Sequence, residues 1–384
     1  MTRDEAFLRA ILDDPEDDTP RLVYADWLEE HGQPERAEFI RTQITLAGLP
    51  PRDPRRPPLE KRERALLRKH GAQWFPPLPT APWQLGANPT VARGFPDSYG
   101  CGVHALLQDG ADLFARWPIT ELWLGIDDAP ELAGTLARAP FLSRLRQLNL
   151  HCPLVGAELL APLFASRHLA NLVRLIAERN ARGEGWGDEG VLPLARSPHL
   201  AGLRELYLHF AGLTAAGLRA LTRSKYRRAM SFLALTGNPL EAEVVAALLT
   251  ADGWPALTGL ELWNTGLDDE DVERLVVCPG LARLTFLNLN YNGLTDRAAR
   301  ALAGSPHAAN LRVLSLAYNS LRSECAQALI DAPRLHGLTA LNLSRNPGIP
   351  ARMRRTLRAH FGDRVTFAGA WDNTPPIRCG TAGA

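Results

Sequence analysis

The sequence predicts an α/β solenoid, with parallel strands on one side and helices on the other, preceded by a small all-helical module. Two observations carry this prediction. From about residue 119 onward the pattern L-x-x-L-x-L-x-x-N-x-L recurs, and its fourth position is Leu in every one of nine copies. Residues 1–47 lack this pattern and instead contain three short stretches whose apolar residues have helical spacing.

The repeat has a nearly constant period. Its fourth-position leucines are Leu122, Leu148, Leu175, Leu206, Leu233, Leu260, Leu287, Leu314 and Leu341. Most of them are 27 residues apart, and one interval of 31 marks an insertion. In a strand, L-x-L places both leucines on one face and the flanking residues on the solvent-facing side. The pattern resembles the leucine-rich repeat in its long, ribonuclease-inhibitor-like form, which implies a right-handed horseshoe with concave strands and convex helices.

Each repeat should continue from its strand through a turn into a helix. The Asn that follows the strand has an amide that can bond backbone groups of neighbouring turns, which would otherwise be buried without partners. This Asn is present as Asn180, Asn238, Asn292, Asn319 and Asn346. Ala- and Leu-rich stretches such as 296–303 follow it, and they favour helices with one apolar face.

The N-terminal segment carries a different motif. Thr19–Gly32 reads TPRLVYADWLEEHG and is followed by RAEFIR at Arg36–Arg41. This string resembles the bacterial repeat-companion domain, a short module that precedes leucine-rich repeats. The resemblance implies no known activity.

We therefore predict five segments. They are a helical repeat-companion module (1–47), a Pro-rich linker with a basic helix (48–80), an N-terminal cap of the solenoid (81–118), leucine-rich repeats with a C-terminal cap (119–370) and a tail (371–384). The basic helix, residues 59–70, could dock on the acidic N-terminal module or contact an acidic partner or nucleic acid, and nucleic acid is the weaker alternative because no aromatic residues are interleaved with the basic ones.

Composition excludes several classes of protein. The chain has 384 residues with 43 basic and 42 acidic side chains, so its net charge of +1 creates no general attraction to nucleic acid or lipid. No apolar stretch reaches the length of a membrane span, and the N-terminus does not resemble a signal peptide. The five cysteines contain no CxxC pair. We expect a cytoplasmic protein with no membrane or nucleic-acid partner.

No catalytic motif is present, so we expect neither an enzyme nor a cofactor. Residues 185–190 match G-x-G-x-x-G, but they follow the preceding strand too late for a dinucleotide site. His151, Glu178 and His209 share one outward position in three successive repeats. Two imidazoles around a carboxylate could hold zinc, or Glu178 could simply hydrogen-bond the imidazoles. We assign no metal site and keep this row as the single candidate.

The outward strand residues are the remaining candidates for function. Aromatic residues concentrate there in the first seven repeats, and exposed Trp and Tyr often dominate binding energies. We predict a partner-binding set of Trp123, Arg174, Tyr207, Phe232, Glu261, Trp263 and Phe286. The alternative is that these rings pack against one another or under the N-terminal module.

The predicted function is a non-catalytic scaffold that binds an unidentified protein partner on the concave face. Two alternatives remain open. Long repeats of this kind also resemble Ran GTPase-activating proteins, so the chain could regulate a GTPase. The row of His151, Glu178 and His209 would instead suit a metal-dependent enzyme.

Overall fold

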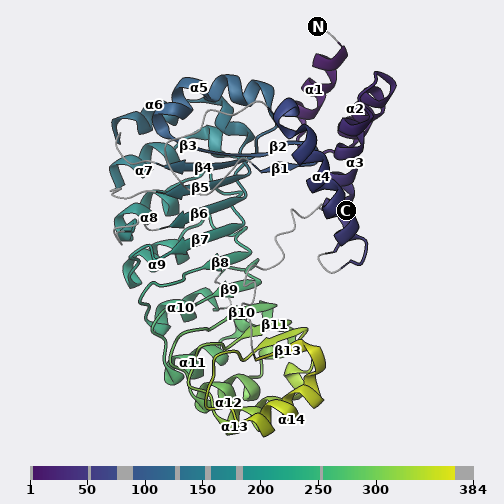
Figure 1. Cartoon of the computed structure of the whole chain (residues 1–384). Helices are drawn as coiled ribbons and strands as arrows, with labels where there is room; N and C mark the ends of the chain where they lie inside the picture. Colours follow the sequence, from purple (N-terminus) through teal and green to yellow (C-terminus); the bar gives the residue numbers. More distant parts are fainter. Residues whose placement is uncertain are drawn as a thin grey trace. The chain divides into compact units, whose positions relative to one another are not determined.

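The computed structural model describes residues 3–50, 53–75, 90–125, 130–151, 157–178, 185–250 and 254–367. The chain divides into two compact units, Met1–Leu150 and His151–Ala384 (Figure 1). Each unit is described separately below. The first unit holds a helical module and the first strands of a ladder, and the second holds a longer ladder of strand–helix repeats, as the sequence predicts.

The first unit begins with four helices. They are α1 (Arg3–Asp13), α2 (Thr19–Glu30), α3 (Pro34–Gly48) and α4 (Arg56–Trp74). Proline lies in the first turn of α2, α3 and α4, where its missing N–H has no helical partner to lose. The predicted basic helix is part of α4, and it docks on α3: Arg62 Nε donates to Glu38 Oε1 at 2.6 Å.

The rest of the first unit starts the repeat ladder. A hairpin of β1 (Val91–Ala92) and β2 (Phe95–Pro96) leads into β3 (Ser98–Gly102), α5 (Val103–Arg116), β4 (Glu121–Gly125), η1 (Pro130–Leu132), α6 (Ala133–Leu136), η2 (Pro140–Arg144) and β5 (Gln147–His151). Strand β3 pairs with β4 in parallel, Tyr99 lying opposite Leu122. The ladder therefore already begins inside the predicted cap.

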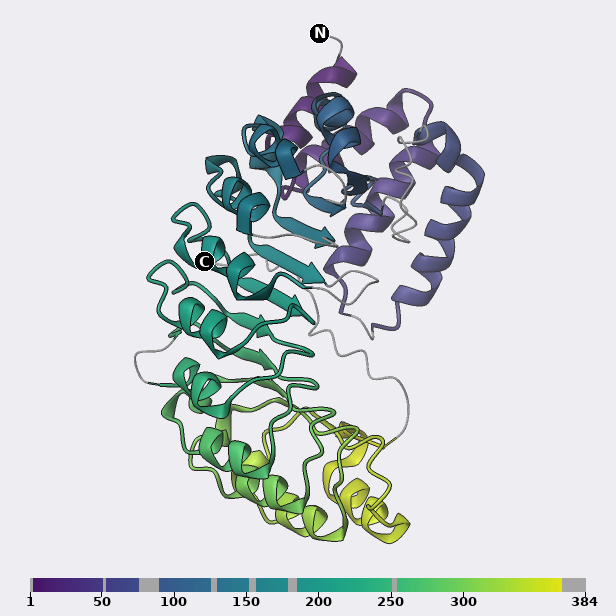
Figure 2. The same ribbon diagram turned by 90° about the vertical axis from the view of Figure 1, so that its left-hand side faces the viewer.

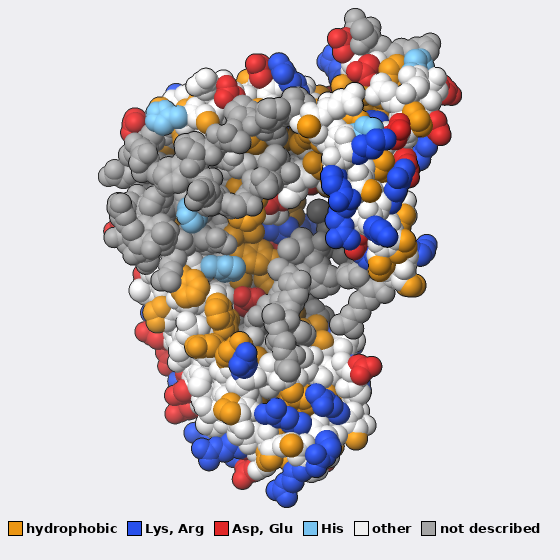
Figure 3. Space-filling view, in the orientation of Figure 1, with side chains coloured by type: hydrophobic (Ala, Val, Ile, Leu, Met, Phe, Trp, Pro, Cys, Tyr) orange, Lys and Arg blue, Asp and Glu red, His pale blue; other side chains and the backbone are white. Residues whose placement is uncertain are grey.

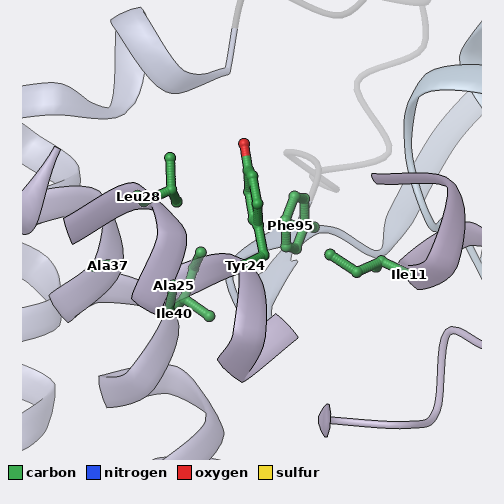
Figure 4. Packing of buried hydrophobic residues seen from close by; sticks show 7 residues of the cluster. All are labelled: Ile11, Tyr24, Ala25, Leu28, Ala37, Ile40 and Phe95. Carbon is green, nitrogen blue, oxygen red and sulfur yellow. The ribbon is translucent and has the colours of Figure 1, made fainter. Parts of the chain in front are cut away.

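The hairpin shares a hydrophobic core with the helical module. Phe95 lies among side chains of α1, α2 and α3, between Ile11 and Tyr24 in the close view (Figure 4). The turn residue Gly94 has φ +91°, and a Cβ on it would lie 2.5 Å from Ile40 Cγ1. Arg36 Nη2 donates to the Gly94 carbonyl at 2.6 Å. Only glycine fits this close approach of hairpin and helix.

The second unit is a ladder of parallel strands. They are β6 (Arg174–Glu178), β7 (Glu205–His209), β8 (Phe232–Ala234), β9 (Gly259–Glu261), β10 (Phe286–Asn288), β11 (Val313–Ser315), β12 (Ala340–Asn342) and β13 (Val365–Thr366). Its fourth-position leucines lie directly opposite one another, for example Leu287 opposite Leu314, and all are buried. The predicted register is confirmed.

Helices cover one side of this ladder. They are α7 (Ala157–Phe164), α8 (Gly187–Arg196), α9 (Ala215–Thr222), α10 (Ala242–Leu248), α11 (Asp269–Val276), α12 (Asp296–Gly304), α13 (Ser323–Ile330) and α14 (Ala351–Phe361). Short 3-10 turns interrupt the connections: η3 (Arg167–Leu169), η4 (Pro279–Arg283), η5 (Ala308–Asn310), η6 (Pro333–Leu335) and η7 (Gly362–Arg364). Figures 1 and 2 show α8 to α12 as one layer beside strands β6 to β10.

The repeated Asn has the predicted role. Asn319 Nδ2 donates to the carbonyls of Leu289 and Leu316 at 3.0 and 3.1 Å, and its Oδ1 accepts from the backbone N–H of Leu294 at 3.1 Å. The corresponding bonds recur at Asn238, Asn292 and Asn346. Asn180 lies outside the described residues. Each amide thus joins its own turn to the preceding repeat.

Candidate functional site

Three of the predicted binding residues pack against one another on the strand face. The Tyr207 and Phe232 rings are 5.2 Å apart between centroids, and the Phe232 and Phe286 rings 5.6 Å. Their exposed fractions are only 7, 7 and 8%. Gly259 makes this possible, because a Cβ there would lie 2.3 Å from the Phe232 ring. The expectation that these rings are exposed is therefore wrong at these positions, and the alternative of mutual packing holds.

The charged members of the predicted set have partners within the array. Arg174 Nε donates to Glu205 Oε2 at 2.5 Å, and the Tyr207 hydroxyl donates to the same oxygen at 3.2 Å. Burial, together with the Glu205 carboxylate, raises the pKa of the Tyr207 phenol. Glu261 Oε1 accepts from Thr236 Oγ1 at 2.6 Å. These bonds fix the side chains as a rigid surface.

Trp123 belongs to the first unit and is half-buried. Its indole Nε1 donates to Glu121 Oε1 at 2.7 Å. The same carboxylate oxygen accepts from Gln147 Nε2 at 2.7 Å and from Asn149 Nδ2 at 3.0 Å. Trp123 is thus held in a polar network of its own unit.

The metal candidate can be placed only in part. Glu178 and His209 lie opposite each other in the ladder of β6 and β7, as their shared repeat position predicts. The side chain of Glu178 lies outside the described part of the structure. Among described residues, no group of three or more His, Cys, Asp or Glu side chains could hold a metal ion. The row of His151, Glu178 and His209 stays an untested candidate.

The residues just before the repeated Asn position form a second, unexpected surface. Each of them adopts a left-handed backbone, with φ values of 50° at Phe210, 61° at Tyr291, 55° at Tyr318 and 55° at Arg345. The ladder holds this conformation, because Tyr291 N–H donates to Ala317 O at 3.1 Å and Tyr318 N–H to Ser344 O at 2.9 Å. Left-handed backbone costs a bulky residue about 1 kcal/mol, so the array stabilises Tyr at an unfavourable position.

Together with Trp263, which precedes the left-handed Asn264, these side chains make one continuous row. We call it the edge row: Phe210, Trp263, Tyr291, Tyr318 and Arg345. Successive ring centroids are 6.1, 6.0 and 5.3 Å apart, and Arg345 Cζ lies 5.9 Å from the Tyr318 centroid. Tyr291 and Tyr318 are 51 and 49% exposed. Large aromatic side chains that remain half in water are candidates for contact with another molecule.

Of the edge row, the sequence-based set contains only Trp263. That set counted the three outward positions of each strand, whereas Tyr291 and Tyr318 lie one residue beyond them. A signal was present. The dipeptide Tyr-Asn occurs at the same repeat position twice in succession, at 291–292 and 318–319. Tyr is an unusual choice where the backbone favours Gly or Asn.

The edge row ends in a basic region. Helix α14 contains four Arg and no acidic residue, and Arg352, Arg355 and Arg358 are exposed. Lys and Arg side chains gather over this end of the second unit (Figure 3). Arg354 of the same helix donates to Ile349 O at 3.0 Å. Arg345 has no acidic side chain within ion-pair distance among the described residues, so its charge is available.

Comparisons with known proteins give one family match and two similar solved structures. A family model described as "Leucine Rich repeat" matches residues 283–303. The chain is similar to an internalin from Listeria monocytogenes, with 22% identity over 66% of this chain and 75% of that chain and a TM-score of 0.38. It is also similar to the Rad7 and Elc1 complex of yeast, with 16% identity over 90% of this chain and 95% of that chain and a TM-score of 0.45. No curated protein matches the chain.

The repeat match and the strand–turn–helix units identify the array as leucine-rich repeats. Within the described ranges, no helix is both long enough and apolar enough to cross a membrane.

Proposed function

We propose that this protein is a non-catalytic scaffold that binds a protein partner on the concave, strand-lined face of its repeats. The edge row would be the main contact. The observation that carries this proposal is the exposure of Tyr291 and Tyr318, which the array maintains at a conformational cost. Tyr is unfavourable for folding at this position, and contact with a partner would explain why it occurs in two successive repeats.

The packed strand face supports such a contact. Tyr207, Phe232 and Phe286 are buried against one another, and ladder hydrogen bonds fix the backbone beside them. A rigid surface loses little conformational freedom when a partner binds, which improves affinity. In this proposal Trp263 contacts the partner directly and Glu261 lies at the margin. The three buried rings act as the platform beneath, and Arg174 extends the surface within the second unit, while Trp123 is a separate contact candidate of the first unit.

We further propose a bacterial origin, ribonuclease-inhibitor-like repeats and a cytoplasmic location for this protein. The motif at Thr19–Gly32 supports a repeat-companion module, and with it a bacterial protein. The spacing of 27 residues supports repeats of the ribonuclease-inhibitor-like kind, and five cysteines without a CxxC pair are compatible with a reducing cytoplasm.

A comparison of variants tests the proposal. Purified full-length chain is immobilised, incubated with extract of the source organism, and the retained proteins are quantified by mass spectrometry. The test variant is Tyr291→Gly with Tyr318→Gly, because glycine suits the left-handed backbone and should preserve the fold. The control is Val277→Ser, which removes a 63% exposed apolar side chain outside the edge row.

We expect the native chain and Val277→Ser to retain the same partner, and the double variant to retain at least about tenfold less, as for loss of hot-spot residues. Circular dichroism should be the same for all three proteins. Undiminished retention by a folded double variant would remove the edge row from the binding surface.

A further inference from the structure

We infer that the partner contacts the edge row through a proline-rich segment in the polyproline II conformation, with an acidic residue at one end. This inference rests on the function proposed above and names the kind of ligand that the row fits. It is carried by three properties of the row: its free hydrogen-bond donors, its spacing and its charge.

The first property is an excess of donors. Trp263 Nε1, the hydroxyls of Tyr291 and Tyr318 and the guanidinium of Arg345 have no hydrogen-bond partner among the described residues. An indole N–H and a guanidinium can only donate. The matching ligand offers carbonyl acceptors and few N–H groups of its own. Proline is the residue with a backbone carbonyl and no N–H, and its ring packs on aromatic faces.

The second property is the spacing. The row crosses successive strands of a parallel sheet, so two steps along it span about 9.6 Å. A polyproline II helix advances about 9.3 Å in each turn of three residues. Prolines at positions i and i+3 of a ligand that lies along the row would therefore meet rings two strands apart. Trp263 and Tyr318 are such a pair, with Tyr291 between them. Phe210 and Trp263 also come from strands two apart, but their rings lean together to a centroid distance of 6.1 Å, because the strand between them carries Gly237.

Gly237 also keeps the row continuous. Its φ is +69°, and a Cβ at this position would lie 2.2 Å from Cδ1 of the Phe210 ring. A side chain here would displace Phe210 from its place beside Trp263. The row thus offers a preformed surface to a ligand that is itself extended and stiff, so neither side loses much conformational freedom on binding.

The third property is the positive charge at one end. Arg345 stacks on Tyr318 and carries no ion pair within the described part of the chain, and the basic helix α14 follows it in sequence. An acidic residue at the matching end of the ligand would complement this charge. An acid in the middle of the ligand would face the aromatic rings instead.

Calorimetric titration of the full chain with synthetic peptides tests this inference. The probes are acetylated decaproline amide, the same peptide with two Asp residues at its N- or C-terminal end, and a Gly-Ser peptide of equal length. Tyr291→Ala and Tyr318→Ala remove rings, Tyr318→Phe removes one donor, Arg345→Gln removes the charge, and Val277→Ser is the control.

We expect both kinds of proline peptide to bind and the Gly-Ser peptide not to bind. One placement of Asp should tighten binding about fivefold, and Arg345→Gln should abolish that gain while leaving plain decaproline unaffected. Each Tyr→Ala variant should weaken binding about tenfold, and Tyr318→Phe only a few-fold. Val277→Ser should bind like the native chain.

Several results would overturn the inference. They are no decaproline binding at millimolar concentration, binding that survives both Tyr→Ala substitutions, and tighter binding of oligothymidine or of a glucan than of either proline peptide. Tighter decaproline binding after Pro375→Ala with Pro376→Ala would identify the chain's own tail as the occupant. If decaproline fails while Tyr291→Gly with Tyr318→Gly still loses the cellular partner, the scaffold function stands and only this ligand class is rejected.

Discussion

At the scale of single residues, buried polar side chains organise the repeats as much as the leucines do. Asn319 satisfies backbone groups of two successive repeats. Its amide nitrogen donates to the carbonyls of Leu289 and Leu316, and its amide oxygen accepts from the Leu294 N–H. The identity of this residue was predictable from its position after the strand. Its bonds follow from the constant 27-residue spacing, which repeats the same turn geometry.

Asn319→Ala should therefore destabilise the array strongly. It leaves several buried backbone groups without partners, and we expect a loss of about 3 kcal/mol in the free energy of unfolding by urea. Ser320→Ala is the matched control, since this adjacent side chain is exposed and should change stability by less than about 0.5 kcal/mol. Equal effects of the two substitutions would contradict the assigned role of the amide.

Other residues could not be predicted individually. Asn290 occupies an outward strand position, yet it is only 2% exposed, and its Oδ1 accepts from the Ser315 hydroxyl and the Ala317 N–H, both at 2.7 Å. The alternation of a strand determines on which side a side chain lies. It does not determine whether side chains of neighbouring repeats cover it, which depends on their sizes.

Asp97 provides a prediction about pH. Burial raises the pKa of its carboxyl to about 6, the Glu121 carboxylate acts in the same direction, and a bond from Thr90 Oγ1 at 2.8 Å opposes the shift. In the unfolded chain the pKa is about 3.9. Between these values the folded state holds the proton more tightly, so the stability of the first unit should fall as pH rises from about 4 to 6.

Asp97→Asn should remove this dependence while keeping an acceptor for Thr90. Hydrogen exchange of strand β3 would then show the variant about 2 kcal/mol more stable than the native protein at pH 7, and equally stable below pH 4. A difference between the two proteins that stays constant from pH 4 to 7 would rule out titration of Asp97 in this range.

At the scale of elements, the repeat units were predictable and the contact between module and hairpin was not. Periodicity predicts strand, turn and helix because the signal for these elements lies within each repeat. The packing of Phe95 among helices α1 to α3 joins segments more than fifty residues apart, with no periodic signal. That Gly94 contacts helix α3 could be seen only in the structure.

Gly94→Ala tests the contact. The added methyl group would collide with Ile40 and occupy a left-handed backbone, so we expect a loss of about 3 kcal/mol, measured by hydrogen exchange in α3 and the hairpin. Gly32→Ala is the control, because Gly32 has φ +79° and no atom within 4 Å of the added Cβ. That variant should lose only about 1 kcal/mol. Losses of the same size would mean that backbone strain alone, rather than packing, explains Gly94.

The edge row could be predicted from the sequence only in part. The strand positions beneath it follow from the repeat pattern, but the exposure of Tyr291 and Tyr318 arises from a left-handed residue at the end of each strand. Counting outward strand positions stops one residue short of them. Comparing the same position across repeats, rather than residues within one strand, would have shown the two tyrosines.

For the whole molecule, the leucine pattern predicts the fold class, whereas the proposed function depends on side chains that differ from repeat to repeat. Nine leucines at one position specify a solenoid. The proposed partner surface depends instead on which repeats carry aromatic residues at the strand ends, and this differs along the chain. We therefore propose the edge row as the place where another protein binds.

Site-specific photocrosslinking tests this claim most directly. A benzophenone amino acid replaces Tyr291 in one full-length protein and Val277 in another, since both positions are exposed and only the first lies in the edge row. After irradiation in cells, adducts are identified by mass spectrometry. We expect a discrete protein adduct from position 291 that position 277 does not form and that Tyr318→Gly reduces. No adduct at 291, or the same adducts from both positions, would contradict it.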